Sequence, residues 1–189
     1  MNVIFLDFDG VIDTNYYHSY YHIEKKIKIL ANICHTYNCK VVIEASAKDS
    51  INEETMEIDS PWVQFIFDLF KKYHIKCIGR TPNVIRYTHP NKISYTSIWK
   101  EDEIRLYLLH HPEIEHYCII DDDDLKAMHQ KSDLDKVRDH LVTTDYYNKQ
   151  NPREEGLLYK HQEEIGKILQ KENKIRRLVL KRNKLKGIE

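Results

Sequence analysis

Two aspartates, Asp7 and Asp9, stand at the end of the first apolar run of the chain, in MNVIFLDFDGVID. The run Val3–Phe8 is rich in β-forming residues and is closed by Gly10, which is typical of a buried strand followed by a sharp turn. Because residues two apart share one face of a strand, we expect the two carboxylates to lie side by side. Carboxylates that close repel and are costly to desolvate, so a bound cation is the simplest compensation. The alternative is a pair of turn residues that caps the next segment.

A second acidic group follows the apolar run Tyr117–Ile120, in YCIIDDDDL. Asp121 and Asp122 come directly after this predicted strand and can face the first acidic pair across neighbouring strands. Three or four converging carboxylates need a hard divalent cation, and magnesium suits a site built from few carboxylates, water and a phosphate. Lys100, in WKEDEI, precedes a predicted helix between the two acidic strand ends. It is either a charge-neutralising partner of these acids or a helix-end ion pair.

Predicted strands and helices alternate along the chain, and they position these residues. This alternation predicts an α/β fold, in which a five-stranded parallel sheet of Rossmann-like form lies between two layers of helices. In such sheets ligands bind at the carboxyl ends of the strands, where the aspartates lie. We expect strands at Asn2–Phe8, Lys40–Ala45, Ile75–Gly79, His116–Ile120 and His140–Thr144, and helices over Ile23–Cys34, Pro61–Phe70 and Glu101–His110.

The composition is that of a soluble globular protein. The chain has 189 residues, of which 41% are hydrophobic and 31% charged. No apolar run is long enough to span a membrane, and we expect no secretory signal. The four cysteines have no partners at zinc-site spacing, so we expect free thiols and a reducing, cytoplasmic location. They are Cys34, Cys39, Cys77 and Cys118.

Charge is unevenly distributed, with an acidic body and a basic C-terminal segment. Residues 157–189 hold ten Lys and Arg against four Glu, a balance of +6, within a chain whose net charge is −1. We predict a core at residues 1–156 and, at residues 157–189, a basic helix packed on or extending from it. This helix could contact nucleic-acid phosphates, or it could be a solvated helix end held by its apolar stripe. Its basic residues are Arg176, Arg177, Lys181, Arg182, Lys184 and Lys186.

Three motifs resemble those of the haloacid dehalogenase superfamily of phosphatases and phosphotransferases. FLDFDGVID resembles its first motif, IIDD its fourth, and Lys100 falls where the third supplies a basic residue. The chain further resembles the small domain of this type in multi-enzyme RNA repair proteins. The resemblance lies in the succession of IGRTP, KEDEIRLYL and a strand that ends in two aspartates. The likeness covers Asn2–Leu169, and the lack of a large insertion between the first two motifs implies a fold with no large cap.

The resemblance implies roles for the acidic residues and the lysine. Asp7 would attack a phosphoryl group to give an aspartyl-phosphate, and Asp9 would act first as general acid and then as general base. Lys100 would steady the nucleophile and the phosphate. The implied ligands of magnesium are Asp7, the backbone carbonyl of Asp9, and Asp121 or Asp122.

The second motif departs from the family. In CKVVIEASAKDS, Glu44 occupies the position of the hydroxyl residue that binds the transferring phosphate, and Ser46 follows two residues later. With Gly10, these are the candidate substrate-binding residues. We expect Glu44 to point into the phosphate site and weaken anion binding there. Alternatively, Glu44 pairs with Lys48 and Ser46 supplies the hydroxyl.

The function that this resemblance implies is magnesium-dependent hydrolysis of a phosphorylated substrate. An open, capless site suits bulky substrates such as RNA or DNA ends. A catalytically weakened binding module that keeps the fold is the alternative, and Glu44 favours it. The tyrosine-rich segment Asn15–His22 falls where the family places a flap, and Arg80–Trp99 is predicted to be irregular.

Overall fold

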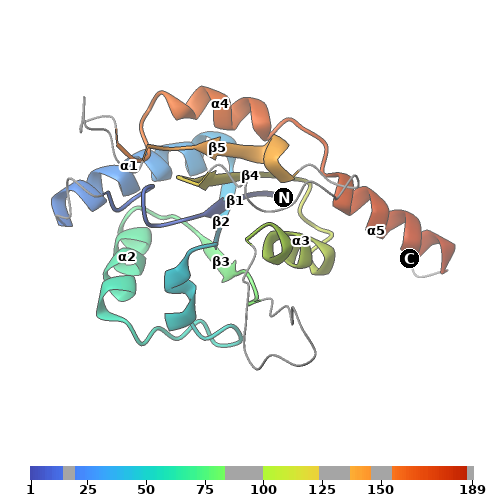
Figure 1. The fold of residues 1–189 in the computed structure, drawn as a ribbon, viewed down its shortest axis with the longest axis horizontal. Helices are drawn as coiled ribbons and strands as arrows, with labels where there is room; N and C mark the ends of the chain where they lie inside the picture. Colours follow the sequence, from blue (N-terminus) through green and yellow to red (C-terminus); the bar gives the residue numbers. More distant parts are fainter. Residues whose placement is uncertain (15–19, 84–99, 124–136, 146–154, 187–189) are drawn as a thin grey trace, which may run out of the picture.

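The computed structural model describes residues 1–14, 20–83, 100–123, 137–145 and 155–186 (Figure 1). Most of the predicted irregular segment Arg80–Trp99 lies outside these residues. Of the predicted flap, only residues 20–22 are described, and they open the first helix, α1 (Tyr20–Tyr37).

Five strands form one parallel sheet in the order β3-β2-β1-β4-β5 (Figure 1). The predicted α/β class and five-stranded parallel sheet are confirmed, and no cap is evident among the described residues. Strand order reverses at β1, whose neighbours are β2 and β4, and crevices at such switch points are the usual ligand sites of these sheets. The strands are β1 (Asn2–Leu6), β2 (Cys39–Ile43), β3 (Cys77–Arg80), β4 (His116–Asp121) and β5 (Leu141–Thr143). The described α-helices are α1, α2 (Pro61–Lys72), α3 (Lys100–His110), α4 (His161–Ile168) and α5 (Lys174–Leu185), with short 3-10 helices η1 (Ser46–Ser50) and η2 (Val137–His140).

Two apolar cores, one on each face of the sheet, give the molecule its three layers. Along β1, Ile4 and Leu6 enter one core and Val3 and Phe5 the other, as the alternation of side chains on a strand requires. Helices α1, α2 and α4 cover the first face, and α3 and α5 cover the second (Figure 1). Helix α3 carries Lys100 as its first residue, so packing of α3 on the sheet brings this lysine to the strand ends.

The start of α2 follows from its sequence. Ser60 is the N-cap, and its Oγ accepts a hydrogen bond from the Val63 amide at 3.4 Å. Pro61 opens the helix, where its missing amide hydrogen has no helical partner to lose. The helix predicted over Pro61–Phe70 is therefore present as α2, and it extends to Lys72.

The basic C-terminal segment forms two helices where we expected one long helix. α4 ends at Ile168, and α5 begins after Asn173, whose Oδ1 accepts from the Arg176 amide at 3.1 Å. The Asn173 amide group also donates to Ile114 O at 2.9 Å, and its side chain is buried. The Asn173 side chain accepts the hydrogen bond of a backbone amide that has no partner within the helix, so a new helix begins there. This cap explains the break between α4 and α5. The division of the chain at residue 156 stays a prediction.

Two expectations drawn from composition can be compared with the structure. All four cysteines are free thiols; Cys34, Cys39 and Cys118 are buried and Cys77 is partly buried. In the part of the chain that the structure describes, no helix has the length and apolar character needed to cross a bilayer.

Candidate active site

Polar residues form a continuous row across four neighbouring strand ends. The parallel register places Asp7, directly after β1, between Glu44, directly after β2, and Asp121, the last residue of β4. The Asp7 amide donates a hydrogen bond to Ile120 O of β4 at 3.0 Å, and the Glu44 amide donates to Leu6 O of β1 at 2.8 Å. The hydrogen bonds between the strands therefore continue to Asp7 and Glu44. Thr81 extends the row at the end of β3. All four residues are at most 5% exposed, which places three carboxyl groups in one buried row.

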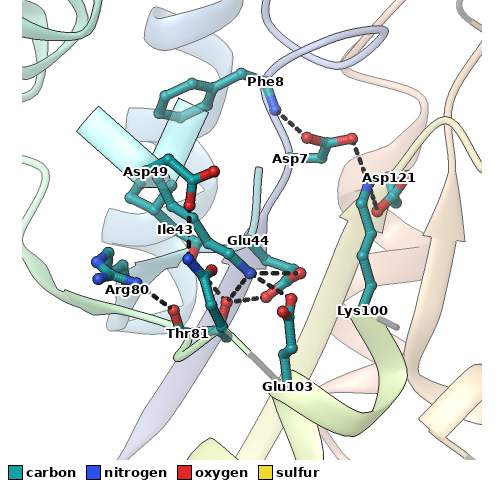
Figure 2. Close-up of polar contacts among 12 residues, drawn as sticks. Asp7, Phe8, Ile43, Glu44, Asp49, Arg80, Thr81, Lys100, Glu103 and Asp121 are labelled. Carbon is teal, nitrogen blue, oxygen red and sulfur yellow. Dashed lines mark hydrogen bonds and ion pairs between the residues drawn. The ribbon is translucent and has the colours of Figure 1, made fainter. Parts of the chain in front are cut away.

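Lys100 bridges the two aspartates of this row (Figure 2). Its Nζ lies 2.7 Å from Asp7 Oδ2 and 2.7 Å from Asp121 Oδ2. The other oxygen of each carboxylate accepts a backbone amide, from Phe8 at 2.8 Å for Asp7 and from Asp123 at 2.9 Å for Asp121. Lys100 therefore contacts the acidic residues at both strand ends, as predicted.

One lysine does not fully offset the acids around it. The pKa of Asp7 is raised to about 7, mainly by burial and also by the neighbouring Asp121, against the opposing effect of Lys100. Burial and Asp121 likewise raise the pKa of Asp122. Burial alone would lower the pKa of Lys100, but the two bonded carboxylates outweigh it and raise that pKa above its usual range. The site thus keeps an excess of negative charge that a cation would relieve.

Three carboxylates of the site are close enough to share a metal ion. Asp7, Asp121 and Asp122 each offer an oxygen, and these oxygens lie within 4.8 Å of one another. Carboxylate oxygens are hard ligands, so this donor set fits a cation such as magnesium or calcium. The cluster is a candidate metal site at the carboxyl ends of the neighbouring strands β1 and β4.

Gly10 makes room for the third of these carboxylates. Its φ is +70°, in the left-handed region, and a Cβ at this position would lie 2.4 Å from both Cβ and Cγ of Asp122. Its carbonyl accepts a hydrogen bond from Thr144 Oγ1 at 2.7 Å, which ties the turn to the chain after β5. Besides allowing the sharp turn, Gly10 lets Asp122 approach.

Asp9 lies in the turn after β1, and its environment differs from that of Asp7. β1 ends at Leu6, so the strand alternation used to place both aspartates on one face does not extend to Asp9. Asp9 is exposed, whereas Asp7 is buried. In this turn the Gly10 amide donates to Asp13 O at 2.6 Å. Asp9 is therefore open to solvent at the rim of the site, and its role stays a prediction.

Glu44 points into a second, closed cluster beside the first (Figure 2). Lys48 Nζ lies 3.4 Å from Glu44 Oε1, donates to Thr81 Oγ1 at 3.0 Å and forms an ion pair with Glu103. Thr81 also bonds to Glu44. The pKa of Glu44 is raised to about 8, mainly by burial, while Lys48 lowers it and Glu103 raises it. Of the two arrangements considered for Glu44, the structure has the pair with Lys48.

Ser46, the other candidate phosphate ligand, differs from Glu44 in accessibility. It is exposed at the start of η1, whereas the Glu44 side chain is 1% exposed and engaged in the cluster. Ser46 is the more accessible of the two to a substrate in solvent. Its role in binding stays a prediction.

Three residues of the closed cluster were not singled out as site residues from the sequence. They are Lys48, Thr81 and Glu103. Each had a signal in the sequence, since Lys48 follows Glu44 by four residues, Thr81 follows the third strand, and Glu103 follows Lys100 by three. Such spacings are common on solvated surfaces, and only the fold encloses these side chains together.

Comparison with known proteins agrees with this geometry. Residues 3–150 match the family described as the HAD domain in Swiss Army Knife RNA repair proteins, where HAD denotes haloacid dehalogenase. No curated protein and no solved structure shows a significant match. The matched segment contains both aspartate pairs, Lys100, strands β2 to β5 and all of β1 except Asn2, and it covers most of the chain. With this match and this fold, the chain belongs to the HAD-domain family of Swiss Army Knife RNA repair proteins.

Proposed function

We propose that the protein is a magnesium-dependent phosphatase that hydrolyses phosphate monoesters through an aspartyl-phosphate on Asp7. The observation that carries this proposal is the Lys100 bridge, which holds the buried Asp7 carboxylate 2.7 Å from an ammonium beside Asp121. Membership of a family whose members are typically phosphohydrolases supports it. A buried carboxylate of raised pKa held by one specific cation is also the kind of group that recurs at catalytic centres.

The chemistry assigned to this chain's own residues has two steps. In the first, an Asp7 oxygen bonds to phosphorus, the ester P–O bond breaks, and Asp9 protonates the departing oxygen. In the second, Asp9 takes a proton from water as the water oxygen bonds to phosphorus, and inorganic phosphate leaves Asp7. Exposure of Asp9 to solvent suits a group that meets both the leaving group and water. Lys100 lowers the pKa of Asp7, which favours the ionised nucleophile, and attracts the substrate phosphate.

We propose magnesium as the metal and Asp7, Asp121, Asp122 and the Asp9 carbonyl as its ligands. Bound there, the cation would offset repulsion between carboxylate and phosphate and stabilise the negative charge of the transferring group. The donor set of three carboxylates within 4.8 Å supports this choice.

Turnover of simple esters tests the proposal directly. We expect hydrolysis of p-nitrophenyl phosphate that requires magnesium and is lost in Asp7→Asn. Asp68→Asn, the same change at an exposed residue of α2, is the matched control and should leave turnover intact. Turnover retained by Asp7→Asn would overturn the mechanism. Binding of magnesium and beryllofluoride without turnover on any ester would instead support the weakened binding module.

We propose RNA ends as the natural substrate class. The family's occurrence in RNA repair proteins supports this choice, and so does the basic surface of α5, where Arg177, Lys181 and Lys184 are exposed. α5 lies at the amino end of β4, since Arg176 Nε donates to Pro112 O at 3.0 Å, whereas the acidic site lies at the carboxyl end. Six residues of strand separate the two, which is on the order of 20 Å.

This separation gives the substrate proposal a measurable consequence. At about 3.4 Å per stacked base, an RNA of about six nucleotides is needed to reach from the site to α5. We expect kcat/KM on end-phosphorylated RNA to rise with length until this span is reached and then to level off. Equal rates on a trinucleotide and a dodecanucleotide would contradict a role for α5 and leave the phosphatase proposal standing.

A further inference from the structure

Two charge clusters at the strand ends share the first turn of α3. Lys100, the first residue of α3, extends to Asp7, directly after β1, and to Asp121, the last residue of β4. Glu103 is fully buried and extends to Lys48, which follows β2. Residues three apart lie on one face of a helix, so a single helical turn presents a cation to one cluster and an anion to the other (Figure 2).

The hydrogen bonds around Thr81 indicate the charge state of the closed cluster. A hydroxyl has one hydrogen and accepts two bonds. Thr81 Oγ1 accepts from Lys48 at 3.0 Å, lies 3.4 Å from Ile43 O and contacts Glu44 Oε2. The single hydrogen of Thr81 can be donated to Glu44 or to the Ile43 carbonyl, but not to both. When Glu44 is protonated it can donate to Thr81, which leaves the Thr81 hydrogen for Ile43 O. The raised pKa of Glu44, about 8, agrees with this assignment.

With Glu44 neutral, the charges of the cluster balance. Lys48 and Glu103 are 4% and 0% exposed and form an ion pair, so neither buried charge is left without its counterpart. The cluster then adds no net charge beside Asp7, although Glu44 stands at the neighbouring strand end. Glu44, which stands where the family has a hydroxyl residue, is thus part of a buried cluster with no net charge.

We propose that Lys48 and Glu103, completed by Glu44 and Thr81, are positioning residues that fix the first turn of α3 and thereby hold Lys100 between Asp7 and Asp121. This inference rests on the proposed function, since it assigns the support for a group of that site. Lys100 acts on the nucleophile, and the cluster acts through Lys100.

The apolar contacts of α3 do not hold its first turn in the way that the Glu103–Lys48 pair does. The buried residues Ile104, Tyr107 and Leu108 anchor the helix on the sheet, but they follow Glu103 toward the C-terminal end. Lys100 is the terminal residue of the helix, and terminal turns are where helices fray. The Glu103–Lys48 pair is a buried ion pair in the same helical turn as Lys100.

The test compares Glu103→Gln with Glu101→Gln in crystal structures of the full chain. Both changes remove one acidic charge from the first turn of α3, but Glu101 lies 3.8 Å from Arg105 of the same helix, whereas Glu103 is tied to the sheet. We expect Glu103→Gln to fold, because Glu44 can ionise and pair with Lys48. Its Lys100 Nζ should leave hydrogen-bonding distance of at least one aspartate, while Glu101→Gln keeps both contacts. Identical Lys100 positions in the two variants would overturn the proposal.

Turnover on p-nitrophenyl phosphate gives a second readout that a merely structural role would not move. We expect Glu103→Gln to lower kcat by about 10- to 100-fold, the scale of a catalytic group displaced by about 1 Å. In a Lys100→Ala background the same change should cost less than twofold, because the residue through which it acts is gone. An equal loss in both backgrounds would contradict positioning of Lys100.

A variant that keeps the charge covers the case in which Glu103→Gln does not fold. Glu103→Asp shortens the side chain by one methylene, so the first turn must shift to keep its bond to Lys48, and we expect Lys100 to be displaced. An unmoved Lys100 in this variant would count against the proposal. If the unaltered protein hydrolyses no ester, the proposed function fails, while the crystal structures still decide whether the cluster positions Lys100.

Discussion

Asp7 and Glu44 follow neighbouring parallel strands at equivalent positions, and both carboxyl groups are buried. Burial raises the pKa of both, to about 7 for Asp7 and about 8 for Glu44. Their partners differ, because Asp7 is bonded to Lys100, whose side chain is 24% exposed, and Glu44 to Lys48, which is 4% exposed. One carboxyl group therefore belongs to a site that is open to a ligand, and its neighbour belongs to the interior.

Replacing Lys100 should change the pH dependence of turnover. Lys100 opposes the effects that raise the pKa of Asp7, so Lys100→Met should raise that pKa further. Because the nucleophile must be ionised, the acidic limb of the kcat/KM profile should move to higher pH by about one unit or more. Lys100→Arg keeps the charge and is the control. An unmoved acidic limb in Lys100→Met would show that Asp7 is not the group that titrates.

Gly10→Ala should weaken metal binding as well as stability. The new Cβ would meet Asp122 at 2.4 Å, and an alanine at positive φ costs about 1 to 2 kcal/mol of folding free energy. We expect lower magnesium affinity by calorimetry and a lower midpoint in urea. Gly156→Ala is the control, because Gly156 also has positive φ, +69°, but its Cβ would meet Val11 O and the Thr14 side chain. It should lose stability and keep its magnesium affinity.

Glu44→Gln should remove a pH dependence of stability. Glu44 has a pKa of about 8 in the folded protein, above its usual value of 4.5, so the folded state binds the extra proton between these values. Its stabilising contribution is therefore full below about pH 4.5 and is lost as the pH rises through about 8. The slope is at most about 1.4 kcal/mol per pH unit. Urea unfolding of both proteins from pH 5 to 8 measures it, and parallel curves would contradict a protonated Glu44.

Phosphate binding should depend on Ser46 rather than on the residue at position 44. Ser46 is exposed, whereas Glu44 is enclosed by its cluster. We expect Ser46→Ala to weaken beryllofluoride binding by about 10- to 100-fold, the scale of one hydrogen bond to a charged group. Ser50→Ala, at the other end of η1, is the control. Glu44→Thr should not tighten binding, and a gain in affinity would show that Glu44 repels the phosphate.

Charge reversal on α5 should affect RNA and spare small esters. Lys181→Glu with Lys184→Glu removes two exposed cations at the edge of the sheet away from Asp7. We expect weaker binding of end-phosphorylated RNA and a shallower dependence on salt, by about one unit of slope per lost contact. Turnover of p-nitrophenyl phosphate should stay the same. Unchanged RNA affinity would leave α5 without a role in substrate binding.

The sequence by itself determined the α/β class and the location of the acidic groups. The apolar run Val3–Phe8, closed by aspartates and Gly10, predicts a buried strand that ends in carboxylates, and the later run before Asp121 repeats the pattern. Side chains at the carboxyl ends of parallel strands meet at one edge, so their convergence followed from local pattern alone. The cap of α2 at Ser60 was equally local, because it depends on residues within one turn.

The tertiary structure decided what the sequence left open. Two arrangements of Glu44 were compatible with the sequence, and the choice depended on Thr81 and Glu103, which approach only after β3 and α3 pack against β2. The break between α4 and α5 likewise depended on a distant group, since Asn173 is held by the carbonyl of Ile114. Burial sets the pKa values of Asp7 and Glu44, and burial is a property of the folded chain. Strand ends can be predicted from neighbours in sequence, whereas the partners of a buried charge come from anywhere in the fold.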